Sequence, residues 1–234
     1  MGQKTNAVLV HGAWADGSSW SKVITILQDK GFNVTAAQLP LTSLDDDIAV
    51  TRNLLATHKG PIVLAGHSYG GVVISGAANG APNVIALVYI AAFGLDEGES
   101  IESLGQQGPA PAGAAQVRPD DHGFLWIDRD GFRQAFAADV DPAEARIMAA
   151  TQKPLSIRSF TAKSGPPAWK HLPSWYLVSS NDQMIPPQAE EFMAKRMGAR
   201  VSTVAASHAS LVSHPKGVAE LIALAAASIG EPAA

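Results

Sequence analysis

The 234-residue sequence predicts an α/β fold, with a doubly wound, mostly parallel sheet of about six strands between two layers of helices. Three observations support this fold class. Short apolar runs alternate along the chain with longer amphipathic segments. Most of the short runs are apolar at nearly every position, as in parallel strands that are covered on both faces. Several of the amphipathic segments are followed by glycine, which commonly ends a helix.

The expected elements follow one another in strand–helix order. The expected strands are residues 7–10, 32–37, 61–66, 83–92, 175–180 and 200–205. The expected helices are residues 18–30, 44–58, 69–79, 187–197 and 214–229. Gly31, Gly60 and Gly198 lie where three of these helices should end. Parallel neighbouring strands then require right-handed crossovers.

Residues 95–168 interrupt this order. They contain no convincing buried strand: a Gly-, Pro- and Ala-rich stretch (104–116) precedes two short helices in 128–152. A segment this long between two sheet strands is usually functional, so we expect a helical lid, with a surface excursion of no function as the alternative. The expected organisation is a core domain of residues 1–94 and 169–234 and a lid or cap insertion of residues 95–168.

The composition excludes several classes of function. The net charge of −4 gives no basic surface for nucleic acid, and the absence of cysteine excludes disulfides, thiolate metal sites and a cysteine nucleophile. No His/Asp/Glu set has metal-ligand spacing. The stretch MGQKTNAVLVHG has too short an apolar run to be expected to act as a signal peptide, and no run approaches membrane-spanning length. We therefore expect a soluble cytoplasmic protein with a small-molecule substrate and with no cofactor, metal, nucleic-acid or membrane partner; the oligomeric state is open, a homodimer being one option.

A Gly-x-Ser-x-Gly motif lies where an expected strand meets an expected helix, in VLAGHSYGGVVIS (63–75). The motif alone is weak evidence, since Ser68 could simply be a small residue in a tight turn. A sharp strand-to-helix elbow, however, needs glycine at its flanks, and Gly66 and Gly70 meet that need. The elbow would lift the Ser68 hydroxyl to the carboxyl edge of the sheet, where α/β folds bind ligands. We therefore expect Ser68 to be a nucleophile.

A nucleophilic serine needs a base and a group that orients the base. His208 follows the last expected strand and is the preferred base, whereas His214 opens the final helix. Asp182 is the only acid in the loop after strand 175–180; it is expected to orient the base, although it could merely form an Asx-turn. His67 is expected to fill the elbow with its ring pointing away from the site.

Two backbone amides should stabilise a developing oxyanion: that of Tyr69 after the nucleophile and that of Ala13 in the glycine-bearing loop after the first strand. The sequence HG at 11–12 could also be a plain strand-end turn, and both interpretations can hold together. The expected substrate-lining residues, each of which could instead belong to core or lid packing, are Trp14, Phe93, Phe124, Trp126 and Met184.

The chain resembles the α/β-hydrolase superfamily over essentially its whole length, and within it the branch of plant methyl esterases, hydroxynitrile lyases and bacterial carboxylesterase-like proteins. The motifs that carry the resemblance are VHGAW (10–14) with Trp20 following, GHSYGG (66–71), NDQMIPP (181–187) and SH (207–208). The resemblance implies an α/β-hydrolase fold, a catalytic triad of Ser68, Asp182 and His208, oxyanion amides at Ala13 and Tyr69, and a lid within residues 95–168.

Two positions depart from the hydroxynitrile lyases of this branch. Gly12 replaces a threonine, and Ala209 replaces the lysine that would stabilise departing cyanide. We therefore expect a cofactor-free serine hydrolase that cleaves small carboxylic esters through an acyl-enzyme. The alternatives are a hydroxynitrile lyase-like or other C–C bond enzyme with the same triad, and a small-ligand receptor. An apolar ceiling formed by Phe124, Trp126, Phe132 and Phe136 would favour short or compact acyl groups over long-chain lipids.

Overall fold

The large parallel sheet is the centre of the molecule. The computed structural model describes residues 5–228, and its main sheet has the strand order β2-β1-β3-β4-β8-β9 with every neighbouring pair parallel. The strands are β1 (Asn6–Val10), β2 (Asn33–Ala36), β3 (Ile62–His67), β4 (Val84–Ile90), β8 (Ser174–Ser179) and β9 (Arg200–Val204). The predicted ranges differ from these only at their ends, which confirms the α/β fold class.

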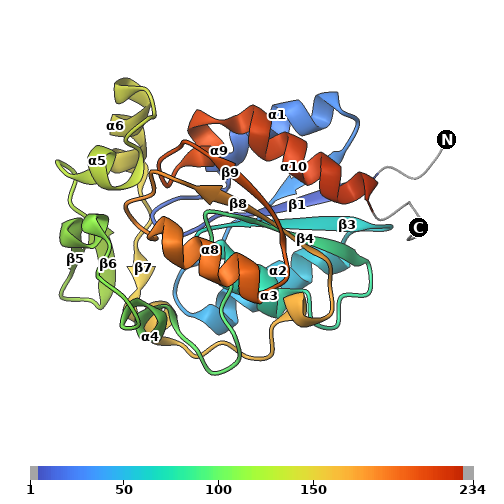
Figure 1. The fold of residues 1–234 in the computed structure, drawn as a ribbon, viewed down its shortest axis with the longest axis horizontal. Helices are drawn as coiled ribbons and strands as arrows, with labels where there is room; N and C mark the ends of the chain where they lie inside the picture. Colours follow the sequence, from blue (N-terminus) through green and yellow to red (C-terminus); the bar gives the residue numbers. More distant parts are fainter. Residues whose placement is uncertain (1–4, 229–234) are drawn as a thin grey trace.

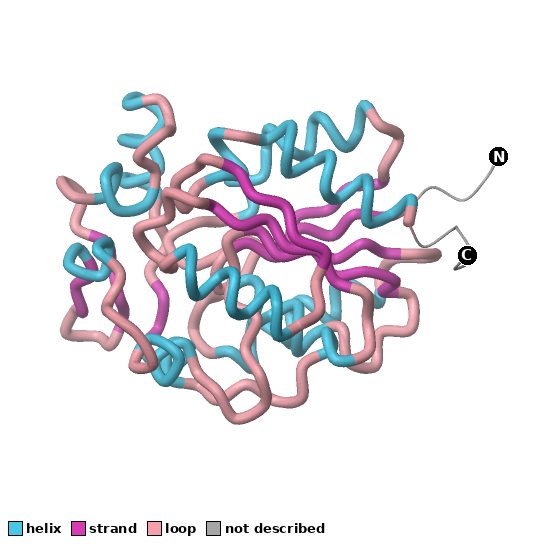
Figure 2. The backbone as a smooth tube through the Cα atoms, in the orientation of Figure 1, coloured by secondary structure: helices cyan, strands magenta, loops and turns pink. Residues whose placement is uncertain are grey.

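Helices cover both faces of this sheet (Figure 1). Figure 2 shows the strands as one twisted layer between the helices. The helix α10 and its neighbour α1 cover one face, and α2, α3 and α8 cover the other. Their bounds are α1 (Ser21–Asp29), α2 (Leu44–Ala56), α3 (Gly70–Ala77), α8 (Pro187–Arg196) and α10 (Pro215–Ala227), with the short α9 (Ser210–Ser213) before the last. The predicted helix end at Ile229 lies outside the described residues.

Burial explains the sequence pattern of the strands. Every residue of β1, β3 and β8 is buried, because helices lie on both faces, and these strands are the near-continuous apolar runs. The two edge strands, β2 and β9, are half-buried or exposed over all their residues. The polar residues within them are therefore compatible with the sheet.

The segment between β4 and β8 forms a second, smaller unit at the carboxyl end of the large sheet (Figure 1). It contains a three-stranded antiparallel sheet, which the sequence did not predict. Its elements are α4 (Ile101–Gly105), β5 (Val117–Pro119), β6 (Phe124–Ile127), α5 (Phe132–Phe136), α6 (Pro142–Thr151), β7 (Leu155–Ser156) and α7 (Ile157–Thr161). β5 and β7 are too short to leave an apolar run, and the run FLWI of β6 is only four residues long and mostly half-buried.

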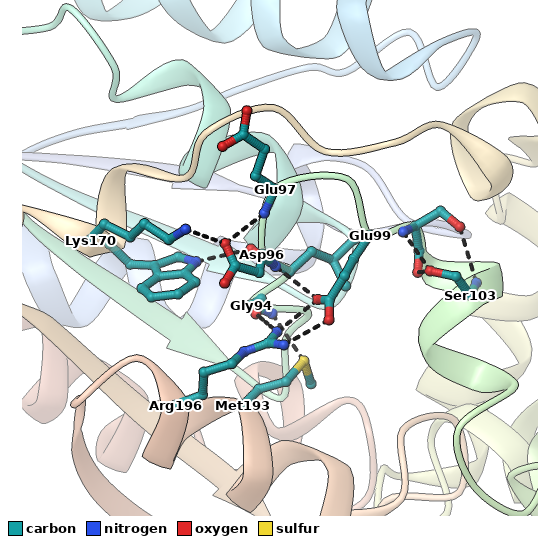
Figure 3. Close-up of polar contacts among 11 residues, drawn as sticks. Gly94, Asp96, Glu97, Glu99, Ser103, Lys170, Met193 and Arg196 are labelled. Carbon is teal, nitrogen blue, oxygen red and sulfur yellow. Dashed lines mark hydrogen bonds and ion pairs between the residues drawn. The ribbon is translucent and has the colours of Figure 1, made fainter.

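The beginning of this segment is anchored to α8 by Arg196 (Figure 3). The Arg196 guanidinium binds both carboxylate oxygens of Glu99, at 2.7 and 2.8 Å, and also donates to the Gly94 carbonyl at 2.8 Å. Lys170 pairs with Asp96 at 2.5 Å, which links the end of the segment to its beginning. Residues 94–99 and 164–170 therefore form a closed base from which the rest of the segment extends.

Candidate active site

Ser68 occupies a sharp turn between β3 and α3. Its φ of +53° lies in the left-handed region, which residues other than glycine rarely adopt and which recurs at functional sites. A Cβ atom on Gly66 would lie 2.6 Å from the Gly70 carbonyl oxygen, and one on Gly70 would lie 2.6 Å from that of Val10. Glycine is therefore needed at both flanks for steric reasons, as the elbow interpretation requires.

Asp182 and His208 lie side by side, and the His208 ring contacts that of His67, the residue before Ser68. His208 Nδ1–H donates to Asp182 Oδ2 at 2.6 Å, and both side chains are fully buried. The other carboxylate oxygen, Oδ1, accepts the N–H groups of Met184 and Ile185 at 2.6 and 3.0 Å. Asp182 therefore forms both the turn and the contact with His208. His208 Nε2 has no hydrogen-bond partner within residues 5–228, so its lone pair is available to a proton donor.

The other candidate base, His214, lies beside Asp139 and Ser213. His214 Nδ1 lies 3.4 Å from Asp139 and 2.9 Å from the Ser213 hydroxyl, with its side chain 40% exposed. Within residues 5–228, Asp182 makes no hydrogen bond or ion pair with His214. The geometry favours His208, which is buried and oriented by a carboxylate, over His214.

The two amides expected to bind an oxyanion, those of Ala13 and Tyr69, have no hydrogen-bond acceptor among residues 5–228. Their neighbours do: Trp14 N–H donates to the Lys153 carbonyl at 2.9 Å, and Ser68 N–H to that of Ile90 at 3.2 Å. A pair of unused amides beside a candidate nucleophile is what an oxyanion requires.

His11 holds the first of these amides in place. Its Nε2 accepts the Leu39 N–H at 2.9 Å, so its Nδ1 carries the proton and donates to the Gly12 carbonyl at 2.8 Å. Burial lowers the pKa of His11 to about 4, so the ring is neutral. A Cβ on Gly12 would lie 2.7 Å from that of Ser68, which shows how closely this loop approaches the elbow.

Asp47 on α2 holds the second of these amides, that of Tyr69, in place. The Tyr69 hydroxyl donates to Asp47 Oδ2 at 2.6 Å, and the Leu41 N–H donates to Oδ1 at 2.8 Å. Burial raises the pKa of Asp47 to about 6, although these two hydrogen bonds act to lower it. The residue that carries the oxyanion amide is thus fixed through its side chain.

The expectation for His67 is wrong. Its ring faces that of His208, with centroids 4.8 Å apart, and its Nε2–H donates to the His208 carbonyl at 2.9 Å. Burial, followed by the neighbouring His208, lowers the pKa of His67 well below its usual range. Phe136 from α5 contacts both rings edge-on. Phe136 is thus buried against the candidate base and, like Phe132, is absent from the described cavity lining.

A cavity of about 960 Å³ opens in front of Ser68. Of the expected lining residues, Trp14, Phe93 and Met184 do line it, whereas Phe124 and Trp126 are not among the described lining residues. Leu125 lines it instead, because successive residues of a strand point to opposite faces. The insertion also contributes Ile101, Leu104, Val117, Leu155, Ile157 and Phe160. Among the described lining residues Glu102 alone is charged, and it is exposed.

Residues 5–228 contain neither a cluster of metal-binding side chains nor a membrane-spanning helix. No group of three or more His, Cys, Asp or Glu side chains in this range could hold a metal ion. Over the same range, each helix is too short or too polar to cross a membrane.

Known proteins resemble this chain over nearly its whole length. The pyrethroid hydrolase of Sphingobium wenxiniae is 27% identical, covering 94% of this chain and 86% of its own, and methylesterase 17 of Arabidopsis thaliana is 22% identical, covering 95% and 92%. A crystal structure of a pyrethroid hydrolase superposes with a TM-score of 0.84 at 25% identity, covering 98% of this chain and 100% of that one.

The structure of polyneuridine aldehyde esterase, 18% identical, shares the fold with a TM-score of 0.82 over 94% of this chain and 98% of its own. The pyrethroid hydrolase and methylesterase relatives, which match by sequence, confirm the expected branch and an esterase-type hydrolase. The alpha/beta hydrolase family profile matches residues 7–221. The chain belongs to the alpha/beta hydrolase family.

Proposed function

We propose that the protein is a cofactor-free serine esterase that hydrolyses uncharged carboxylic esters with medium-sized apolar groups through an acyl-enzyme. The observation that carries this proposal is the fully buried His208–Asp182 pair. His208 Nε2 is unpaired among the described residues, and the His208 carbonyl accepts a hydrogen bond from His67, the residue before Ser68. A neutral imidazole with its Nδ1–H on a carboxylate is the arrangement that removes a proton from a serine hydroxyl.

The proposed reaction has two steps. Ser68 Oγ attacks the ester carbonyl carbon while His208 Nε2 takes the hydroxyl proton, and the Ala13 and Tyr69 amides bind the oxyanion. The tetrahedral intermediate collapses, and the alcohol leaves with the proton from His208. Water then attacks acyl-Ser68 while His208 takes its proton. The second tetrahedral intermediate collapses as His208 returns that proton to Ser68 Oγ, and the carboxylic acid is released.

The cavity supports a preference for esters with bulky apolar groups. Its volume of about 960 Å³ is near the upper limit for small-molecule sites, and its lining is predominantly apolar. It could hold groups larger than the shortest acyl chains, which widens the expectation from sequence. A relative that matches 94% of this chain is named pyrethroid hydrolase. Residues 95–168, which supply much of the lining, are proposed to be the lid.

The test is a series of p-nitrophenyl esters with acetate, butyrate, octanoate and palmitate as acyl groups. Each buried methylene should favour binding by about 0.8 kcal/mol until the cavity is full. We expect kcat/KM to rise from acetate towards octanoate and to fall for palmitate, and Ser68→Ala to be inactive on all four. A maximum at palmitate would reject the enclosed site. Ser68→Ala activity comparable to the wild type would reject the mechanism.

A further inference from the structure

A carboxyl group that the proposed mechanism does not use lies behind the triad. Glu190 is on α8, and its side chain is fully buried. It shares one face of the helix with Met193, Ala194 and Met197, which are all buried. A glutamate is almost never fully buried unless it is paired, because ionised carboxylates are costly to remove from water.

The contacts of Glu190 suit a neutral acid. Its Oε2 accepts the Ser179 N–H at 3.1 Å, while its Oε1 is buried and has no recorded partner among the described residues. The charged groups that act on it are Asp182 and, on its own helix, Glu191. Burial, followed by the negative charge of the nearby Asp182, raises the pKa of Glu190 well above its usual range.

The carboxylate of Asp182 has room for one more donor. A carboxylate can accept about four hydrogen bonds. Asp182 already accepts three: the N–H groups of Met184 and Ile185 on Oδ1 and the His208 Nδ1–H on Oδ2. The Tyr176 hydroxyl is also influenced by the charges of Glu190 and Asp182. It donates its hydrogen bond to the Ala92 carbonyl and not to Asp182. A protonated Oε1 of Glu190 could therefore supply the fourth.

We propose that Glu190 is a positioning residue for the triad, a neutral carboxylic acid whose Oε1–H donates to Asp182 and fixes the orientation in which Asp182 receives the His208 Nδ1–H. This proposal rests on the proposed function, because it assigns a task to the same triad. Donation by Glu190 withdraws charge from Asp182, which then stabilises a protonated His208 less strongly. Loss of the donor should therefore make the base harder to deprotonate.

Two variants separate hydrogen bonding from packing. Glu190→Gln keeps both contacts, since the amide can accept from Ser179 and donate to Asp182. Glu190→Met keeps the length but donates nothing. We expect the Gln variant to match the wild-type kcat within about twofold, and the Met variant to lose about tenfold in kcat with little change in KM. The acid limb of its kcat/KM profile should move to higher pH. Glu191→Gln, at the exposed neighbour, is the control and should change nothing.

At alkaline pH the wild type should lose activity as Glu190 ionises, and the Gln variant should not. If the Met variant does not fold, the comparison of the wild type with the Gln variant at alkaline pH tests the proposal instead. An active Met variant with the wild-type pH profile, or a Gln variant with kcat reduced tenfold or more, would overturn the proposal.

A proton NMR measurement, which does not depend on enzyme activity, tests the contact between Glu190 and Asp182 separately from the proposed esterase function. The downfield proton resonance of the His208 Nδ1–H, identified by its absence in His208→Ala, should shift in the Met variant and remain unchanged in the Gln variant. The same resonance in all three proteins would refute the contact between Glu190 and Asp182 even if esterase activity were never found.

Discussion

Asp47→Asn tests the support beneath the Tyr69 amide through the stability of the fold. Folding raises the pKa of Asp47 from its usual 3.8 to about 6, mainly because the carboxyl group is buried. The folded state therefore binds more protons than the unfolded state between these values, and stability from this group falls as pH rises through them. A difference of about two pH units corresponds to about 3 kcal/mol.

The asparagine variant resembles the neutral carboxyl group, because its oxygen can accept from Leu41 and its amide can donate to the Tyr69 hydroxyl. The free energy of unfolding, measured by urea titration at pH 4 to 7, should therefore rise in the variant relative to the wild type by up to about 3 kcal/mol across this range. Asp45→Asn, at an exposed position on the same helix, is the control. Parallel pH curves for the Asp47→Asn variant and the wild type would refute the reasoning.

Two further predictions concern the triad and the base of the insertion. His208→Ala should reduce kcat/KM by three orders of magnitude or more and His214→Ala by little, as esterase assays would show; the opposite ranking would identify His214 as the base. Arg196→Met should lower the free energy of unfolding by about 2 kcal/mol, because two charged hydrogen bonds to the partly buried Glu99 are lost. Unchanged urea stability would mean that this anchor contributes nothing.

The large sheet could be predicted from sequence because its strands carry the strongest local signal. A strand such as β1, covered on both faces, must be apolar throughout, and the chain order then fixes which strand ends share an edge. The contact between Asp182 and His208 follows from that edge, since each comes directly after a neighbouring strand.

The insertion and the layer behind the triad could not be predicted in the same way. The pairing of β6 with the two-residue β7 is non-local, and without β6 the choice between Leu125 and its aromatic neighbours as lining residues could not be made. His67 contacts His208 only through the tertiary fold. The burial of Glu190 could have been predicted from the sequence. Glu190 is followed by apolar residues at helical spacing, which places it on the buried face of its helix; these residues are Met193, Ala194 and Met197, at i+3, i+4 and i+7.

The most direct test of the central claim is covalent labelling of Ser68. A p-nitrophenyl phosphonate transfers its phosphonyl group to an activated nucleophile and is not readily released by water. One p-nitrophenol should be released per chain, and peptide mass spectrometry should find the phosphonyl group on the peptide that contains Ser68, with no labelling in His208→Ala on the same timescale. Stoichiometric labelling elsewhere, or steady ester turnover in a preparation that Ser68 labelling leaves fully active, would contradict the proposed nucleophile.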